Sequence, residues 1–231
     1  MGRWGWRLFE GDQDLDVACC LAASLGFETN DWEYSMSSMV HQTDMLAGEA
    51  ARAFYRTEEY KRELENDILP YVRAKLDTDN LGYRLFATSR TQENGQSVPS
   101  TAKYRTIVLG ALMMRAGARI RPEDLQHLKD LVPQVHCNSQ FVSPSFDEGF
   151  RTPGRAQFLA ALDHYQAGVP RNYQEPSCFQ CGQVKADIEH DLVQCARCYV
   201  AYYCDKECQR RHWQEHKASC ASPEERRMVN I

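Results

Sequence analysis

Apolar residues recur every three or four positions through most of the first 170 residues. This spacing places them on one side of a helix, whereas a half-buried strand would alternate apolar and polar residues. Capping residues precede most of the apolar runs, and glycine or proline follows several of them. We therefore expect a mainly α-helical domain over residues 1–170. Its predicted helices begin at Asp12, Asp44, Thr57, Lys103, Pro122 and Thr152.

Glycine and proline residues set the expected limits of these helices. The first helix is expected to end at Gly26, the helix from Lys103 at Gly117, and the helix from Thr152 at Gly168. Pro70 lacks an amide hydrogen and is expected to kink or restart the helix that begins at Thr57.

Polar stretches without apolar periodicity separate the predicted elements. Residues 88–100 and 138–150 are rich in Ser, Asn, Gly and Pro, and they predict surface loops. The two prolines Pro170 and Pro176 disfavour helix and stiffen the chain between them. We therefore expect residues 171–177 to link the helical domain to a C-terminal module.

Seven of the ten cysteines lie between Cys178 and Cys220, in closely spaced pairs. Two ligands a few residues apart can turn onto one metal ion, and tetrahedral zinc needs two such pairs. Four successive pairs therefore predict two zinc ions. Both are expected to be structural, because protein ligands fill every coordination position. The pairs are Cys178-x2-Cys181, Cys195-x2-Cys198, Cys204-x3-Cys208 and His216-x3-Cys220.

The spacing of Cys208 and His216 limits how these pairs combine. Asp205 is a good N-cap, and residues 206–219 predict one helix. Eight residues of helix rise about 12 Å, whereas two ligands of one zinc lie at most about 4.6 Å apart. Cys208 and His216 are therefore expected on different zinc ions, which leaves two possible ways of combining the four pairs.

The residues around the last two pairs carry a specific resemblance. The sequence Tyr203-Cys204-x3-Cys208-Gln209-x3-Trp213-x2-His216-Lys217-x2-Cys220 closely resembles the second half of a MYND-type zinc finger. This resemblance implies an interleaved two-zinc fold with a short hairpin and a C-terminal helix over residues 178–220, followed by a tail over residues 221–231. The thirteen-residue gap between Cys181 and Cys195 is long for the family and predicts an extended loop. The implied ligand sets are Cys178, Cys181, Cys204 and Cys208 for one zinc, and Cys195, Cys198, His216 and Cys220 for the other.

The resemblance also implies a function for the finger. MYND fingers are typically protein-interaction modules, and several bind short proline-rich peptides beside their hairpin strand. Gln209 and Trp213 match the positions of the family's peptide groove. The alternative for Trp213 is that its ring packs the helix onto the hairpin. His212 lies one helical turn from two ligands, but the family pattern has no ligand at this position.

Charge argues against nucleic acid as the partner. The whole chain has a net charge of −5, and the basic and acidic side chains between Pro176 and Cys220 cancel. Seven zinc-bound thiolates would make the loaded module acidic, whereas a nucleic-acid reader needs a basic face.

No run of eighteen apolar residues occurs, and the N-terminal residues lack the apolar core of a signal peptide. We therefore expect no membrane association and an intracellular location, in the nucleus or the cytoplasm. In such a reducing compartment, paired cysteines favour zinc over disulfides.

The alternative to an adaptor is an enzyme whose activity lies in the helical domain. Some relatives of the finger lie within lysine methyltransferases, but the Asn-His-Ser-Cys type of cofactor motif is absent here. The nearest sequence, His136-Cys137-Asn138-Ser139, has a different order, and only eleven residues follow Cys220. We therefore expect an adaptor rather than an enzyme, with an unrecognised activity in the helical domain as the alternative.

Other features of the helical domain are expected to be structural. Cys19 and Cys20 are predicted to lie in its core. Asp12, Asp14 and Asp16 are predicted to be first-turn acids, which the helix dipole stabilises. The N-terminal Trp4 and Trp6 are predicted to anchor that end of the chain. This opening is similar to the start of fungal MYND-containing proteins, a resemblance that implies no activity.

Overall fold

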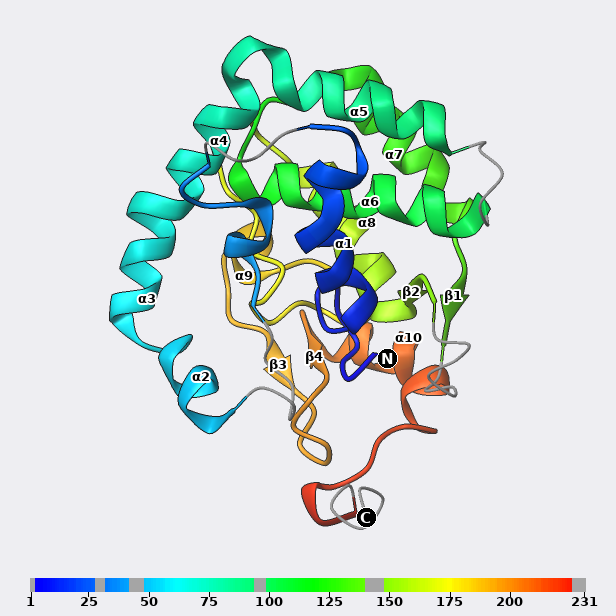
Figure 1. Cartoon of the computed structure of the whole chain (residues 1–231). Coiled ribbons are helices and arrows are strands. Elements are labelled where there is room, and N and C mark those ends of the chain that lie inside the picture. Colours follow the sequence, from blue (N-terminus) through cyan, green and yellow to red (C-terminus); the bar gives the residue numbers. More distant parts are fainter. Residues whose placement is uncertain (1–2, 28–31, 42–47, 94–98, 140–147, 226–231) are drawn as a thin grey trace.

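The computed structural model of this chain describes residues 3–27, 32–41, 48–93, 99–139 and 148–225. Helix α6 (Pro99–Ala116) lies at the centre of the helical domain (Figure 1). It contacts α1 (Asp12–Ser24), α4 (Leu69–Asp77), α5 (Leu81–Gln92) and α7 (Pro122–Leu131).

Helix α6 is buried on every side over its second half. All residues from Ile107 to Ala118 are buried, because other helices cover the whole circumference. The sequence predicted a helix from Lys103 with one apolar face. The observed helix starts four residues earlier at Pro99, and it ends as predicted before Gly117, which has a φ of 71°.

Short elements precede the central helices. A 3-10 helix (Met36–Met39) and α2 (Glu49–Phe54) lead to α3 (Glu58–Glu63), which Thr57 caps. A π-helical turn (Leu64–Ile68) continues α3, and α4 begins at Leu69 with Pro70 in its first turn, where a restart was expected. The predicted start at Asp44 lies outside the described residues. In α2 the side chains of Ala50, Ala53 and Phe54, whose helical spacing favours burial, are exposed.

Helix α5 was not predicted from the sequence, and residues 88–100 were expected to form a loop. The helix follows a 3-10 turn (Thr78–Asn80) and extends to Gln92, so the connection to α6 is shorter than predicted. Its buried positions are Gly82, Leu85, Phe86 and Ser89, which have helical spacing. Glycine and serine occupy two of these positions, so the sequence shows no continuous apolar pattern there. Ser89 can nevertheless be buried, because its hydroxyl forms a 2.6 Å hydrogen bond with Thr106.

The predicted surface loop 138–150 is bounded by a short parallel strand pair. Strand β1 (Cys137–Asn138) follows a 3-10 turn (Val132–Gln134) and pairs with β2 (Phe150–Arg151). Helix α8 (Thr152–His164) follows β2 and starts at Thr152 as predicted. It ends at His164 and not at Gly168, because Tyr165 already has extended backbone angles.

Helix α1 confirms Asp12 and Asp14 as first-turn acids and corrects the expectations for its N-cap and for two cysteines. It begins at Asp12 with Gly11 as its N-cap, so Asp12 lies in the first turn and is not the cap. Cys19 and Cys20 are exposed and do not lie in the core, because the helix buries Ala18 and Leu21 instead. Asp14 is fully buried, where its carboxylate accepts hydrogen bonds from Arg3 and Tyr104.

The C-terminal part contains β3 (Val193–Gln194), β4 (Tyr202–Tyr203) and two helices, α9 (Lys185–Ile188) and α10 (Lys206–His216). Strands β3 and β4 form an antiparallel pair below the helical domain in Figure 1. Residues 171–177, which were expected to form a link, are packed in place, and Tyr173 and Ser177 are buried. No helix among the described residues has the length and apolarity required to cross a membrane.

Candidate metal centre

Eight cysteine and histidine side chains form two compact clusters in the C-terminal part. Within each cluster the potential ligand atoms all lie within 4.8 Å of one another. Successive ligand pairs along the sequence belong to alternate clusters. The first and third pairs form one cluster, and the second and fourth pairs form the other. Cys178, Cys181, Cys204 and Cys208 form the first cluster, and Cys195, Cys198, His216 and Cys220 form the second.

Distances within the clusters suit zinc and not disulfides. The sulfurs of Cys181 and Cys204 lie 3.4 Å apart, and those of Cys195 and Cys220 lie 3.8 Å apart. A disulfide bond is about 2.05 Å long, whereas two sulfurs on a tetrahedral zinc are separated by about 3.8 Å. The 3.6 Å between the Cys198 sulfur and Nε2 of His216 also suits a shared ion.

Two similar turns present the first pair of ligands in each cluster. The amide of Gly182 donates to the carbonyl of Cys178, and the amide of Tyr199 donates to the carbonyl of Cys195. Gly182 and Tyr199 both have positive φ angles, of 79° and 55°. Each turn therefore reverses the chain within five residues, which brings its two cysteines to one side.

The second pair of ligands depends on the cap of α10. The carboxylate of Asp205 accepts a 2.8 Å hydrogen bond from the amide of Cys208, as expected for an N-cap. This contact fixes the first turn of α10 beside β4, which ends one residue before Cys204. Cys208 and His216 then lie at opposite ends of the helix and belong to different clusters, as the helix rise predicted.

Burial and hydrogen bonding shift the pKa values of thiols in both clusters. A hydrogen bond from Cys181 lowers the pKa of Cys178 to about 5. Burial raises the pKa of Cys204 to about 12, and it does the same for Cys220 in the second cluster. Zinc binds the thiolate form of cysteine, so zinc that binds these sites must displace protons from the buried thiols.

His212 lies outside both clusters and packs α10 onto the hairpin. It is buried, and its Nδ1 lies 3.0 Å from the hydroxyl of Tyr203 on β4. The His212 ring contacts the rings of Phe179 and His216, at centroid distances of 6.0 and 5.8 Å. Burial lowers the pKa of His212 to about 4, so its ring is neutral at physiological pH.

Trp213 does not have this packing role. Its side chain is 43% exposed, and it meets the ring of His216 at a centroid distance of 5.9 Å. Gln209, one turn earlier on α10, is partly exposed. The sequence assigned the packing alternative to Trp213, whereas the neighbouring His212 fills that position.

Contacts between the finger and the helical domain were not predicted from the sequence. Trp6 packs against the finger at Phe179, with ring centroids 6.2 Å apart. Arg171 forms an ion pair with Asp187, which lies in the long gap between the first two ligand pairs. The spacing of residues along the sequence does not predict either contact, because each contact joins residues from separate elements.

Comparisons with known proteins agree with this geometry. The family model of the MYND finger matches residues 178–220. N-lysine methyltransferase SMYD2 of Gallus gallus is 31% identical over 96 residues, which cover 40% of this chain and 21% of that protein. SMYD2-A of Danio rerio is 31% identical over 87 residues, covering 32% of this chain and 19% of that protein. No solved structure matches the chain significantly.

Residues 178–220 are therefore a MYND zinc finger whose two clusters fit two zinc ions. The chain matches only about a fifth of the length of these methyltransferases.

Proposed function

We propose that the MYND finger recruits a protein partner and that Gln209 and Trp213 form part of the binding surface. The exposure of Trp213 is the observation that carries this proposal. Tryptophan side chains contribute strongly to protein interfaces, because they bury a large apolar area and retain one hydrogen-bond donor.

The core of the finger does not require the indole of Trp213. Phe179, Tyr203 and His212 already join α10 to the hairpin, whereas the ring contact of Trp213 is with His216 on its own helix. Gln209 lies four residues before Trp213 and thus on the same side of α10. This side of the helix is available to a partner.

The hairpin supplies a second feature that suits an extended peptide. Strand β4 is flanked by β3 and by a bridge to Cys178, whereas β3 has no second partner strand among the described residues. Val193 on β3 is 51% exposed. A free strand edge can accept a peptide through backbone hydrogen bonds.

The proposed binding residues on α10 and β3 favour an uncharged segment of the partner. Gln209, Trp213, Val193 and Gln194 carry no charge, and an aromatic ring beside an amide is a common surface for proline-rich peptides. We therefore propose a proline-rich or otherwise uncharged extended peptide as the ligand. Nucleic acid is disfavoured, because the loaded finger is acidic.

The test compares the intact chain with Trp213→Ala, after metal analysis shows two zinc ions in each. Partners captured from cell extract are identified first, and peptides from them are then titrated by calorimetry. We expect Trp213→Ala to weaken peptide binding by about tenfold or more, as for an interface hot spot. The control is Gln214→Ala, which changes the adjacent exposed residue of α10 and should bind as the wild type does.

Equal affinity of the wild type and a zinc-loaded Trp213→Ala variant would exclude this surface. Loss of binding in the Gln214→Ala control as well would indicate general damage to α10. In that case, Gln209→Ala provides the second measurement on the proposed surface.

The similarity to SMYD2 supports a second candidate, an activity in the helical domain. Those relatives are named as lysine methyltransferases, but the match covers only about a fifth of their length. We propose that the helical domain positions the finger and does not catalyse methyl transfer. Binding of S-adenosylmethionine to the full chain, measured by calorimetry, would contradict this proposal and favour the enzyme.

The proposed organisation is a helical domain over residues 1–170, joined through residues 171–177 to the finger. An adaptor of this kind is proposed to act in the nucleus or the cytoplasm. Imaging of a tagged chain tests that location.

A further inference from the structure

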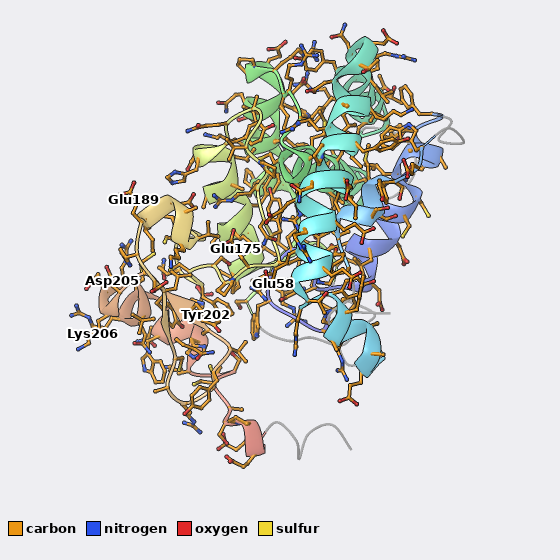
Figure 2. The ribbon with its side chains drawn as sticks, turned by 90° about the vertical axis from the view of Figure 1, so that its left-hand side faces the viewer. Glu58, Glu175, Glu189, Tyr202, Asp205 and Lys206 are labelled. Carbon is orange, nitrogen blue, oxygen red and sulfur yellow. The ribbon has the colours of Figure 1, made fainter. Side chains whose placement is uncertain are left out.

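The thirteen residues between Cys181 and Cys195 contact the helical domain and not only the finger. This stretch was expected to be an extended loop, but its first half contains α9 and lies against α8 and residues 171–177. We call residues 182–188 the docking segment. In Figure 2, Glu189 lies at the outer edge of the finger just after this segment, and Glu175 lies between the finger and the helices.

Gly182 makes the closest approach in the docking segment. A β-carbon at this position would lie 1.9 Å from the carbonyl oxygen of Ala156 in α8. Such a distance is far below van der Waals contact, so only glycine permits this packing. The turn that presents Cys178 and Cys181 therefore rests directly on the backbone of α8.

Asp187 fixes the other end of the docking segment. Its carboxylate accepts two hydrogen bonds from the Arg171 guanidinium, at 2.5 and 2.6 Å, and a third from the amide of Val184. The Asp187 side chain is 4% exposed. The amide of Arg171 in turn donates to the carbonyl of Met114 in α6. A continuous chain of contacts thus joins the central helix to the first zinc cluster.

The N-terminal segment closes the same interface. The ring of Trp6 lies between Phe179 of the finger and the guanidinium of Arg151, which is 5.2 Å from the ring centroid. The carbonyl of Trp6 approaches Gly154 in α8, where a β-carbon would lie 3.1 Å from it. The N-terminal segment is therefore held between α8 and the finger.

We propose that the docking segment couples zinc binding to the folding of α8 and the N-terminal segment. Zinc fixes the turn that carries Gly182, and a finger of this size cannot hold that geometry through its small core alone. Loss of zinc therefore removes the packing partners of Trp6, α8 and Arg171 together. With zinc bound, the exposed surface that carries Trp213 keeps a fixed orientation relative to the helical domain. This coupling does not depend on the identity of any partner.

The test measures hydrogen exchange in the full chain before and after a chelator removes zinc. We expect exchange to rise by about tenfold or more in residues 3–11 and in α8, as well as in the finger. Helix α5 is remote from the interface and serves as the internal reference. If protection is lost only within residues 178–220, the proposed coupling is wrong.

A substitution separates docking from zinc binding. Asp187→Asn removes the charge that holds Arg171 but leaves all eight zinc ligands. We expect this variant to retain two zinc ions and to show faster exchange in residues 3–11 and α8. The matched control is Asp191→Asn, since the Asp191 ion pair with Lys185 lies in the same gap but is exposed to solvent. Unchanged exchange in a zinc-loaded Asp187→Asn variant would overturn the role of the docking segment.

Discussion

The hydroxyl of Tyr203 on β4 lies 3.0 Å from Nδ1 of His212 on α10. Burial raises the pKa of Tyr203 and lowers that of His212 to about 4, so the phenol keeps its proton and the imidazole is neutral. The hydroxyl can therefore donate to the ring nitrogen. This bond connects the hairpin and the helix between the two zinc clusters.

Tyr203→Phe should destabilise the finger modestly without loss of metal. The ring packing against Phe179 remains, but the buried Nδ1 of His212 loses its hydrogen-bond partner, at a cost of about 1–3 kcal/mol. Thermal unfolding of the zinc-loaded protein measures the change, and metal analysis should still give two zinc ions. Loss of one zinc ion in this variant would show that the contact is required for ligation.

Cys204→Ser should remove the first zinc ion. Serine is a poor zinc ligand, and a structural zinc contributes on the order of 10 kcal/mol to the folding of a finger. We expect two zinc ions per chain in the wild type and about one in the variant, measured by elemental analysis. Cys19→Ser is the control, because Cys19 is exposed and belongs to neither cluster. One zinc ion in the wild type would contradict the two-site structure.

Asp14→Asn should destabilise the helical domain strongly. The Asp14 carboxylate is fully buried and accepts hydrogen bonds from Arg3, Tyr104 and the amide of Phe9. Removing one partner of a buried ion pair typically costs about 3–5 kcal/mol. Urea unfolding of the zinc-loaded chain measures the loss.

Asp16→Asn is the control for this substitution, because Asp16 lies on the exposed side of the same helix. Its effect should stay within about 0.5 kcal/mol, as for most surface changes. Equal stability of the two variants would show that the buried ion pair with Arg3 contributes little.

His41 should make stability depend on pH. Burial, followed by the nearby Arg115, lowers its pKa to about 4, from an ordinary value of about 6.5. Its ring stacks on Tyr55 at 4.1 Å and meets the edge of Tyr60. Below pH 6.5 the unfolded chain binds a proton that the folded chain does not, so stability falls as the pH falls toward 4 and is unaffected above that window.

Unfolding by urea at several values from pH 7 to pH 5 measures this effect. His41→Gln removes the titrating group, so its stability should fall less steeply over the same range. Because acid also weakens zinc binding in both proteins, the relevant quantity is the difference between their slopes. Parallel slopes would show that His41 does not contribute.

Local sequence signals predicted several of the helix boundaries. Pro122 and Thr152 mark the observed starts of α7 and α8, and Gly117 follows the end of α6. These signals succeed because a missing amide hydrogen or a positive φ acts on the residue itself. Helix α5 was missed because Gly82 and Ser89 occupy buried positions, which only their partners on α6 explain.

The spacing of cysteine and histidine residues similarly predicted most of the arrangement of the metal clusters. Ligand pairs two or three residues apart, and the rise of one helix, allow only a few arrangements. The resemblance to the MYND family then implied one of them. That Gln209 and Trp213 bind a peptide is a prediction from the same resemblance.

The sequence by itself therefore determined the mainly helical class, the MYND finger and its two zinc-binding sets. The helical class and the ligand pairs depend on residue type and short spacing, which constrain the chain locally, and the grouping of the pairs into two sets also depends on the family resemblance. Only the tertiary structure decided that His212 packs α10 while Trp213 stays exposed, that Cys19 and Cys20 face solvent, and that Asp187 reaches Arg171. Each of these outcomes depends on which surface of another element covers a side chain, and such packing joins residues that have no fixed spacing in the sequence.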